Sequence, residues 1–189
     1  MAQSLCPWLL GYVLASPLRR LIEDPVKVLA PWISEGMTVF EPGPGMGFFT
    51  LEMARMVGDS GKIVCVDIQP KMLQVLMKRA RKSGVDGRID ARLAEDSDMK
   101  VSDLAGQVDL IFAYAVIHEL PDAASFFRQA APLLKPGGRI LIAEPKSHVP
   151  ESCLVDNISF AQAEGLVLDS RPDTRRYRRA VLVRPPAKV

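Results

Sequence analysis

The chain has 189 residues, of which 48% are hydrophobic and 24% are charged, a globular composition that excludes long disorder and fibrous structure. Its 24 Lys and Arg against 22 Asp and Glu leave a net charge of +2, which does not call for nucleic acid or an anionic membrane as a partner. The length predicts a single domain over residues 1–189, and three cysteines without a CxxC pattern favour a reducing, cytoplasmic setting.

The N-terminal segment contains an apolar run over residues 7–15 that two arginines close. This run is shorter than the roughly 20 residues that a transmembrane helix needs. A secretory signal would require Lys or Arg before the apolar run, and none is present there. We therefore expect residues 1–22 to form a lid-like segment on a core of residues 23–189, with Trp8 and Tyr12 near a bound substrate.

In the first half of the chain, short strand-like runs alternate with helical patterns. Asp24 followed by Pro25 is typical of a helix start, because Asp caps the first turn and Pro fits the first helical position. The predicted elements are a helix over 25–33, a strand over 37–40, a glycine-rich loop over 41–47, a helix over 48–57, a strand over 62–67 and a helix over 70–82.

The second half continues the alternation. We expect strands over 88–93 and 108–113, a helix over 122–134, a strand over 139–143, a helix over 151–164, and strands over 166–170 and 176–184. The Pro-Gly-Gly sequence at 136–138 stops the first of these helices. This order predicts a doubly wound, Rossmann-like α/β sheet of parallel strands with helices on both faces. No helix separates the last two strands, so the last one should return antiparallel as a hairpin.

The glycine-rich loop is the predicted ligand site, because ligands of open α/β sheets bind beyond the carboxyl ends of the strands. Gly43, Gly45 and Gly47 let the backbone turn and let a ligand approach closely. Their G-x-G-x-G spacing differs from the G-x-G-x-x-G of dehydrogenases, and the carboxylate of Glu41 suits a cationic ligand better than a pyrophosphate. Asp67 ends the second strand, where a carboxylate can accept hydrogen bonds from both ribose hydroxyls.

Three motifs resemble those of the class I S-adenosylmethionine-dependent methyltransferases: Glu-Pro-Gly-Pro-Gly-Met-Gly at 41–47, Val-Asp at 66–67 and Leu-Leu-Lys-Pro-Gly-Gly-Arg at 133–139. The resemblance covers about residues 25–184 and implies seven strands in the order 3-2-1-4-5-7-6, with the last strand antiparallel. It also implies S-adenosyl-L-methionine as the cofactor. The implied cofactor positions are Glu41, Gly43, Gly45, Gly47, Asp67, Ile68, Glu95, Asp96, Ala113 and Tyr114.

The resemblance implies a role for each position on the first two strands. The glycines, with Glu41 at their edge, line the methionine part of the cofactor. Asp67 holds the ribose and Ile68 lies against one face of the adenine. From the residues alone, an alternative is that Asp67 caps the helix before Pro70.

The later positions complete the implied site. Between residues 94 and 97 an acidic side chain, for which we favour Glu95, reaches the adenine amino group, while the Asp96 N–H meets a ring nitrogen. The Ala113 carbonyl, with Tyr114, lies near the methionine ammonium. The alternative for both acidic residues is that of a solvated loop charge.

His118 and Glu119 are the candidate catalytic residues, because they follow the fourth strand and face the expected substrate pocket. An unperturbed His titrates at about pH 6.5, so His118 can take a proton from a hydroxyl or thiol acceptor. The alternative is that both residues only fix the turn and cap the helix at 122. No base is needed if the acceptor is already nucleophilic, because alignment alone can then drive the displacement.

Two further features have structural explanations that we favour. The basic clusters at 78–82 and 175–179 complement a helix dipole and protect a sheet edge, respectively, rather than bind nucleic acid. Cys6 and Cys153 flank the expected substrate pocket and could serve a soft acceptor, but isolated cysteines usually pack as small hydrophobes. We predict no metal site.

The sequence therefore predicts a small methyltransferase with a small-molecule acceptor and no membrane partner. One alternative is an RNA or protein methyltransferase, and for RNA the binding would depend strongly on salt. Another is a non-catalytic partner subunit of the same fold. The acceptor atom and the oligomeric state stay open.

Overall fold

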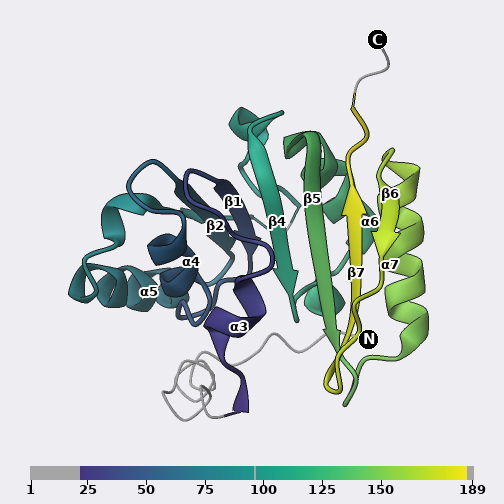
Figure 1. Ribbon diagram of the computed structural model, residues 1–189, viewed down its shortest axis with the longest axis horizontal. Coiled ribbons are helices and arrows are strands. Elements are labelled where there is room, and N and C mark those ends of the chain that lie inside the picture. Colours follow the sequence, from purple (N-terminus) through teal and green to yellow (C-terminus); the bar gives the residue numbers. More distant parts are fainter. Residues whose placement is uncertain (1–21, 96, 187–189) are drawn as a thin grey trace. The chain divides into compact units, whose positions relative to one another are not determined.

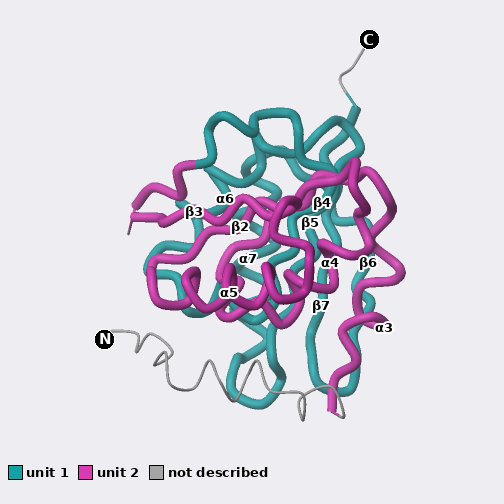
Figure 2. The backbone as a smooth tube through the Cα atoms, turned by 90° about the vertical axis from the view of Figure 1, so that its left-hand side faces the viewer, with its two compact units in different colours: residues 1–3, 101–189 teal, residues 4–100 magenta. Residues whose placement is uncertain are grey.

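The structure is a computed structural model that describes residues 22–95 and 97–186 (Figure 1). The seven strands of this described part form one sheet in the order β3-β2-β1-β4-β5-β7-β6, which confirms the order that the resemblance implied. The chain divides into two compact units, residues 1–3 with 101–189 and residues 4–100 (Figure 2). The prediction of a single domain stays a prediction. The lid with Trp8 and Tyr12, as well as Cys6 and Asp96, lie outside the described residues.

In the unit of residues 4–100, the described residues form three parallel strands, β1 (Thr38–Pro42), β2 (Lys62–Asp67) and β3 (Ile89–Leu93). β2 pairs with both neighbours, so that Cys65 lies opposite Glu41 on one side and Ala91 on the other. The residues from Ile63 to Val66 are all buried, as expected for a parallel strand covered on both faces. The first strand extends beyond its predicted end at Phe40, because Glu41 and Pro42 still pair with β2.

The described part of this unit has three α-helices: α3 (Pro25–Leu29), α4 (Thr50–Met56) and α5 (Pro70–Lys82). The Asp24 carboxylate accepts a hydrogen bond from the Val26 N–H at 3.0 Å, which confirms the predicted cap of α3. α3 ends before its predicted end at residue 33 because Pro31 follows, and a proline has no N–H to continue a helix. α5 has its predicted bounds and lies against β2 and β3, and a 3-10 turn, η1 (Asp86–Arg88), precedes β3.

The unit of residues 101–189 contains β4 (Val108–Tyr114), β5 (Leu134–Pro145), β6 (Val167–Ser170) and β7 (Tyr177–Val183). β4 and β5 are parallel, whereas β7 runs antiparallel to both β5 and β6, which confirms the predicted hairpin. β5 begins at Leu134, not at the predicted Arg139, because Gly137 and Gly138 exchange hydrogen bonds of 2.8 and 2.9 Å with Arg184. The Pro-Gly-Gly segment therefore lies within β5, where the register with β4 shifts, instead of preceding the strand.

The helices of this unit are α6 (Ala123–Ala130) and α7 (Glu151–Ala163), with 3-10 turns η2 (Ser102–Leu104), η3 (Ile117–Glu119) and η4 (Ala131–Leu133). Asp122 caps α6 through the Ser125 N–H at 2.9 Å. α6 was predicted to reach residue 134, but Pro132 tightens its end into η4. α7 packs on α6, β6 and β7. Among the described helices, none combines the length and the apolar composition of a transmembrane segment.

Candidate active site

The glycine-rich loop after β1 adopts a backbone that only glycine tolerates easily. Gly43, Gly45 and Gly47 all have positive φ angles, of 63°, 54° and 81°. A Cβ atom at Gly45 would meet nothing within 4 Å, whereas one at Gly47 would lie 3.1 Å from Cγ of Leu76. The backbone at Gly45 therefore leaves room for a ligand, and Gly47 instead allows close packing against α5.

Two contacts from outside the loop hold its backbone in place. The Gly43 N–H donates to the Val66 carbonyl at 2.8 Å. The guanidinium group of Arg79 reaches from α5 and donates to the Met46 carbonyl. Sequence analysis placed Arg79 only within a basic cluster, so its contact with the loop was missed.

Glu41 is a buried carboxyl group directly before this loop, with 4% of its surface exposed. The Thr50 hydroxyl at the start of α4 donates to Glu41 Oε2 at 2.6 Å. Burial raises the pKa of Glu41 to about 8, with a smaller contribution from the Asp67 charge, and the Thr50 hydrogen bond only partly opposes this rise. The group therefore carries a proton at neutral pH and gains a charge when a cation approaches.

Asp67 lies at the carboxyl end of β2, and its Oδ1 accepts a hydrogen bond from the Gln69 N–H at 2.9 Å. The N-cap residue of α5 is Gln69, so Asp67 itself is not the cap. Ile68 is 37% exposed, and Leu93, which is paired with Asp67 on β3, is 52% exposed. Apolar side chains thus reach solvent beside a carboxylate at this edge, a combination that suits the adenosine half of a cofactor.

Glu95 follows β3 in an exposed turn. Its backbone N–H donates to the Asp98 carbonyl at 2.9 Å, and its Oε1 lies 3.3 Å from Nζ of Lys100. This surface ion pair fits the alternative of a solvated loop charge. The adenine contact of Glu95 stays a prediction, and Asp96 is outside the described residues.

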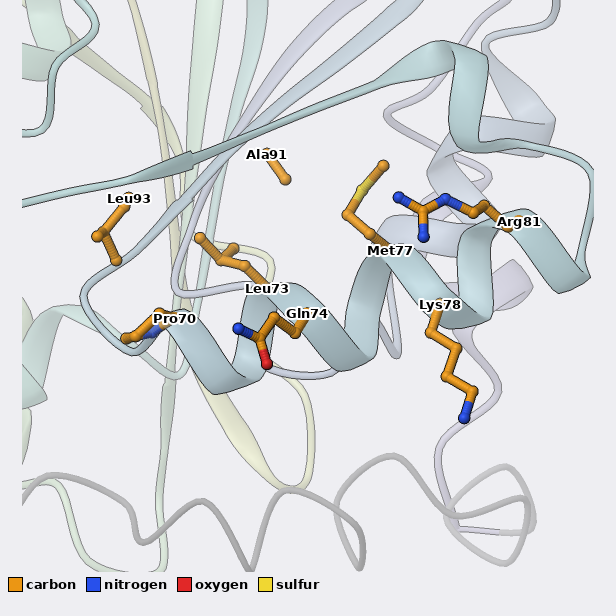
Figure 3. A pocket seen from close by; sticks show the side chains of 8 residues that line it. All are labelled: Pro70, Leu73, Gln74, Met77, Lys78, Arg81, Ala91 and Leu93. Atoms are coloured by element: carbon orange, nitrogen blue, oxygen red, sulfur yellow. The ribbon is translucent and has the colours of Figure 1, made fainter.

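A shallow groove of 590 Å³ lies between α5 and β3 in the same unit (Figure 3). Leu73, Met77 and Leu93 contribute apolar surface to it, and Lys78 and Arg81 add positive charge. None of the predicted cofactor positions lines this groove.

In the unit of residues 101–189, β4 ends at Tyr114, one of the predicted cofactor residues. Tyr114 is 8% exposed, and its hydroxyl accepts a hydrogen bond from Arg179 at 3.2 Å. Ala113 is fully buried opposite Ile142 of β5. The next residue, Ala115, has a φ of 54°. Such strain costs about 1–3 kcal/mol and is often held at functional sites.

His118, in η3, forms a close pair with a residue that sequence analysis did not single out. Its Nδ1 lies 2.6 Å from Oε2 of Glu144, which is near the end of β5 and only 1% exposed. Its Nε2 lies 3.4 Å from Nε2 of the exposed His148, and Oε1 of Glu119, the other candidate catalytic residue, is 3.9 Å from the same Nε2. A carboxylate accepts hydrogen bonds, so Nδ1–H of His118 donates to Glu144, and Nε2 of neutral His118 is left as the basic nitrogen.

The carboxylates around His118 determine its protonation. Burial lowers the pKa of His118, but the Glu144 hydrogen bond and the charges of Glu144 and Glu119 outweigh it and raise that pKa above 6.5. Burial also raises the pKa of Glu119. The arrangement gives a stronger base than a free histidine.

Glu144 and His148 could not be found from a motif. The only signal was the position of Glu144 at the carboxyl end of a predicted strand, where ligand-binding residues gather. Cys153 is half-buried on α7, and its role stays a prediction. Within the described ranges, no three His, Cys, Asp or Glu side chains are placed to bind a metal ion.

Comparisons with known proteins identify the family of the chain. A family model described as "Methyltransferase domain" matches residues 33–172. A protein of Salmonella arizonae named ubiquinone/menaquinone biosynthesis C-methyltransferase UbiE is 29% identical over 149 residues, which cover 77% of this chain and 59% of that protein. Its namesake in Vibrio cholerae is 30% identical over 146 residues, covering 75% of this chain and 55% of that protein. The chain thus spans little more than half the length of these relatives.

Solved structures share the fold. A SAM-dependent methyltransferase from Aquifex aeolicus superposes with a TM-score of 0.83 at 22% identity, covering 95% of this chain and all of that one. Fibrillarin from Aeropyrum pernix, in complex with natively bound S-adenosyl-L-methionine, gives a TM-score of 0.64 at 23% identity. It covers 93% of this chain and 76% of that one.

Proposed function

We propose that this chain, which belongs to the methyltransferase-domain family of S-adenosylmethionine-dependent enzymes, methylates a small-molecule acceptor. A hydroxyl group of the acceptor loses its proton to His118. The observation that carries the proposal is the 2.6 Å contact between His118 Nδ1 and Glu144. A buried carboxylate behind an imidazole is the arrangement of a general base.

The residues of the unit 4–100 fit the cofactor. The space at Gly45 accommodates a ligand against the backbone. The buried carboxyl group of Glu41 can become charged beside a cationic group, and Asp67 can accept from ribose hydroxyls next to the exposed Ile68. When bound, S-adenosylmethionine supplies a methyl group on a positively charged sulfur.

His118 would take the acceptor proton on Nε2 while Glu144 holds Nδ1–H and stabilises the imidazolium. The exposed His148, 3.4 Å away, offers the proton a route to water. The relatives' names refer to C-methylation in quinone biosynthesis. Loss of a proton from a ring hydroxyl makes the neighbouring ring carbon nucleophilic, so a hydroxylated ring as acceptor agrees with both the base and the names.

Calorimetric titration with S-adenosylmethionine and S-adenosylhomocysteine tests the cofactor site. We expect Asp67→Ala to weaken both by at least tenfold, because each hydrogen bond to a charged group contributes about 1.5–3 kcal/mol. Asp169→Ala, which removes an exposed carboxylate of β6, is the control and should bind like the wild type. Absence of binding by folded wild-type protein would contradict the proposal and favour a non-catalytic subunit.

The acceptor class needs a second measurement. We expect methylation of hydroxylated aromatic compounds, followed by S-adenosylhomocysteine release, with no salt-dependent binding to RNA. Tight RNA binding that weakens steeply with salt would instead support a nucleic-acid methyltransferase.

A further inference from the structure

Arg179 is a buried cation without an anionic partner. It lies on β7 opposite Ala143 of β5 and is 9% exposed. One terminal nitrogen donates to Tyr114 Oη at 3.2 Å, but Nε is buried without an acceptor. Arg179 forms no ion pair with any residue that the structure describes. An unpaired buried charge is costly, so the fold tolerates Arg179 at the expense of stability.

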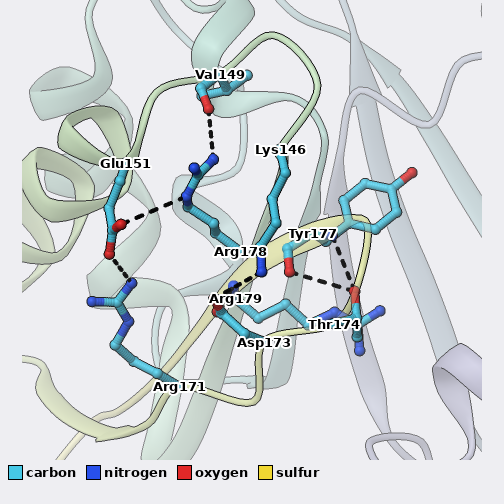
Figure 4. A network of polar contacts seen from close by, with 9 residues as sticks. All are labelled: Lys146, Val149, Glu151, Arg171, Asp173, Thr174, Tyr177, Arg178 and Arg179. Atoms are coloured by element: carbon cyan, nitrogen blue, oxygen red, sulfur yellow. Dashed lines mark hydrogen bonds and ion pairs between the residues drawn. The ribbon is translucent and has the colours of Figure 1, made fainter.

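The carboxylate that contacts the Arg179 backbone, Asp173, already has two partners. Asp173 Oδ1 accepts from the backbone N–H of Arg179 at 2.7 Å, and Oδ2 lies 3.3 Å from Nζ of Lys146. The Arg179 side chain runs away from this carboxylate (Figure 4). The other cations of the network, Lys146, Arg171 and Arg178, all form ion pairs. Arg179 thus differs from the neighbouring cations of this network in having no carboxylate of the described residues beside its guanidinium group.

Arg179 lies at the edge of the sheet where a methyl acceptor is expected to bind. Tyr114 is the last residue of β4, and Ala143 lies close to the end of β5, so the guanidinium group lies near the carboxyl ends of parallel strands. The rings of Tyr114 and Tyr177 are 4.6 Å apart, and Phe112 stacks on Tyr114 at 5.2 Å. Phe112 and Tyr114 are buried, whereas Tyr177 is half-buried. Tyr177 is therefore the ring that can offer a flat ligand aromatic surface beside the charge.

We propose that Arg179 binds an anionic oxygen of an aromatic methyl acceptor, either a carboxylate or a ring oxygen that has lost its proton. This inference rests on the proposed function and specifies its substrate class. Nε and the adjacent terminal nitrogen form a planar fork that matches two acceptor oxygens. The carboxylate of the cofactor has the same chemistry, so the experiment must separate the two sources.

Benzoate and its neutral analogue benzamide are suitable probes. Calorimetry on protein saturated with S-adenosylhomocysteine should show wild type binding benzoate at least tenfold more tightly than benzamide. Arg179→Met should remove this preference, and Arg179→Lys should keep part of it. Arg178→Met, the control on the neighbouring and ion-paired arginine, should leave the preference intact. Equal binding of both probes to wild type, or binding of neither, would overturn the proposal.

The affinity for S-adenosylhomocysteine separates the possible failures. If Arg179→Met weakens it tenfold without any acceptor present, Arg179 serves the cofactor carboxylate and the proposal is wrong. If wild type binds no S-adenosylhomocysteine at all, the proposed function fails and this inference fails with it. Normal cofactor affinity without a preference for benzoate overturns the role of Arg179 alone.

Thermal unfolding distinguishes ligand binding from a structural role. Without ligand, Arg179→Met should leave Tm unchanged or raise it, because it removes an unpaired buried charge. Arg178→Met should lower Tm, because it breaks an ion pair and the 2.8 Å hydrogen bond to the Val149 carbonyl. A lower Tm for Arg179→Met together with an intact preference for benzoate would show a structural role instead.

Discussion

Glu41 and Glu144 are both almost completely buried, yet their carboxyl groups meet different partners. Glu41 accepts a hydrogen bond from the Thr50 hydroxyl, whereas Glu144 accepts one from the imidazole of His118. A hydroxyl group brings no charge, so burial dominates at Glu41 and raises its pKa. An imidazole can take a proton, so the hydrogen bond and the charge of Glu144 raise the pKa of His118.

The raised pKa of Glu41 links folding stability to pH. Its pKa is about 8 in the folded chain against 4.5 unfolded, so the folded state binds the proton more tightly. The resulting stabilisation is complete below pH 4.5 and is lost as the pH rises through 8, at up to about 1.4 kcal/mol per pH unit. Glu41→Gln, measured by urea unfolding between pH 5 and 8, should lack this slope relative to wild type.

An exposed carboxylate provides the control for this comparison. Glu164→Gln, just after α7, should retain the wild-type dependence on pH. Parallel pH profiles for Glu41→Gln and wild type would mean that Glu41 is already ionised in the folded protein.

Removing the charge of Glu144 should lower the pKa of His118. A general base acts when neutral, so the rising limb of kcat/KM against pH should move to lower pH in Glu144→Gln, and the plateau should fall because the base is weaker. Glu119→Gln should cause a smaller shift, because Glu119 lies 3.9 Å from His118 without a hydrogen bond. An unchanged midpoint in Glu144→Gln would contradict the base role.

At this scale the sequence indicated residues that lie at the ends of strands but not their long-range partners. Glu41, Asp67 and His118 follow predictable strand ends. By contrast, the His118–Glu144 contact spans 26 residues and the Arg179–Tyr114 contact spans 65. Such contacts depend on which strands become neighbours and in what register, and no local pattern encodes that.

At the scale of elements, the junction of the glycine-rich loop with α5 is tightly packed. A Cβ at Gly47 would press on Leu76, and its φ of 81° disfavours any other residue. We expect Gly47→Ala to reduce the free energy of unfolding by more than the roughly 1–2 kcal/mol of left-handed strain alone. Gly84→Ala, at a φ of 67° with nothing within 4 Å, should show the strain alone, and equal losses in the two variants would contradict the packing argument.

The accuracy of the predicted bounds follows the strength of local signals. α5 was predicted from Pro70 to Lys82 because a proline starts it and buried residues recur on one face. The predicted lengths of α3 and α6 are too long, because Pro31 and Pro132 end these helices before the apolar pattern does. The early start of β5 depends on its pairing with β4 and on the hydrogen bonds to Arg184, which only the folded chain reveals.

For the whole molecule, the alternation of strands and helices in the sequence was enough to predict the class of fold. The antiparallel hairpin of β6 and β7 also followed, because six residues between Ser170 and Tyr177 leave no room for a crossover helix. The full strand order came from the resemblance to a family. Nothing in the periodicity of β7 indicates that it lies between β5 and β6.

That place of β7 affects how the protein folds during synthesis. β6 leaves the ribosome before β7, yet among the described strands its only neighbour is β7. At roughly 5–20 residues per second, β7 follows on the order of a second later. In that interval the backbone of β5 that later pairs with β7 is open to other chains, and a ribosome-bound chaperone that covers it would protect the nascent protein from aggregation.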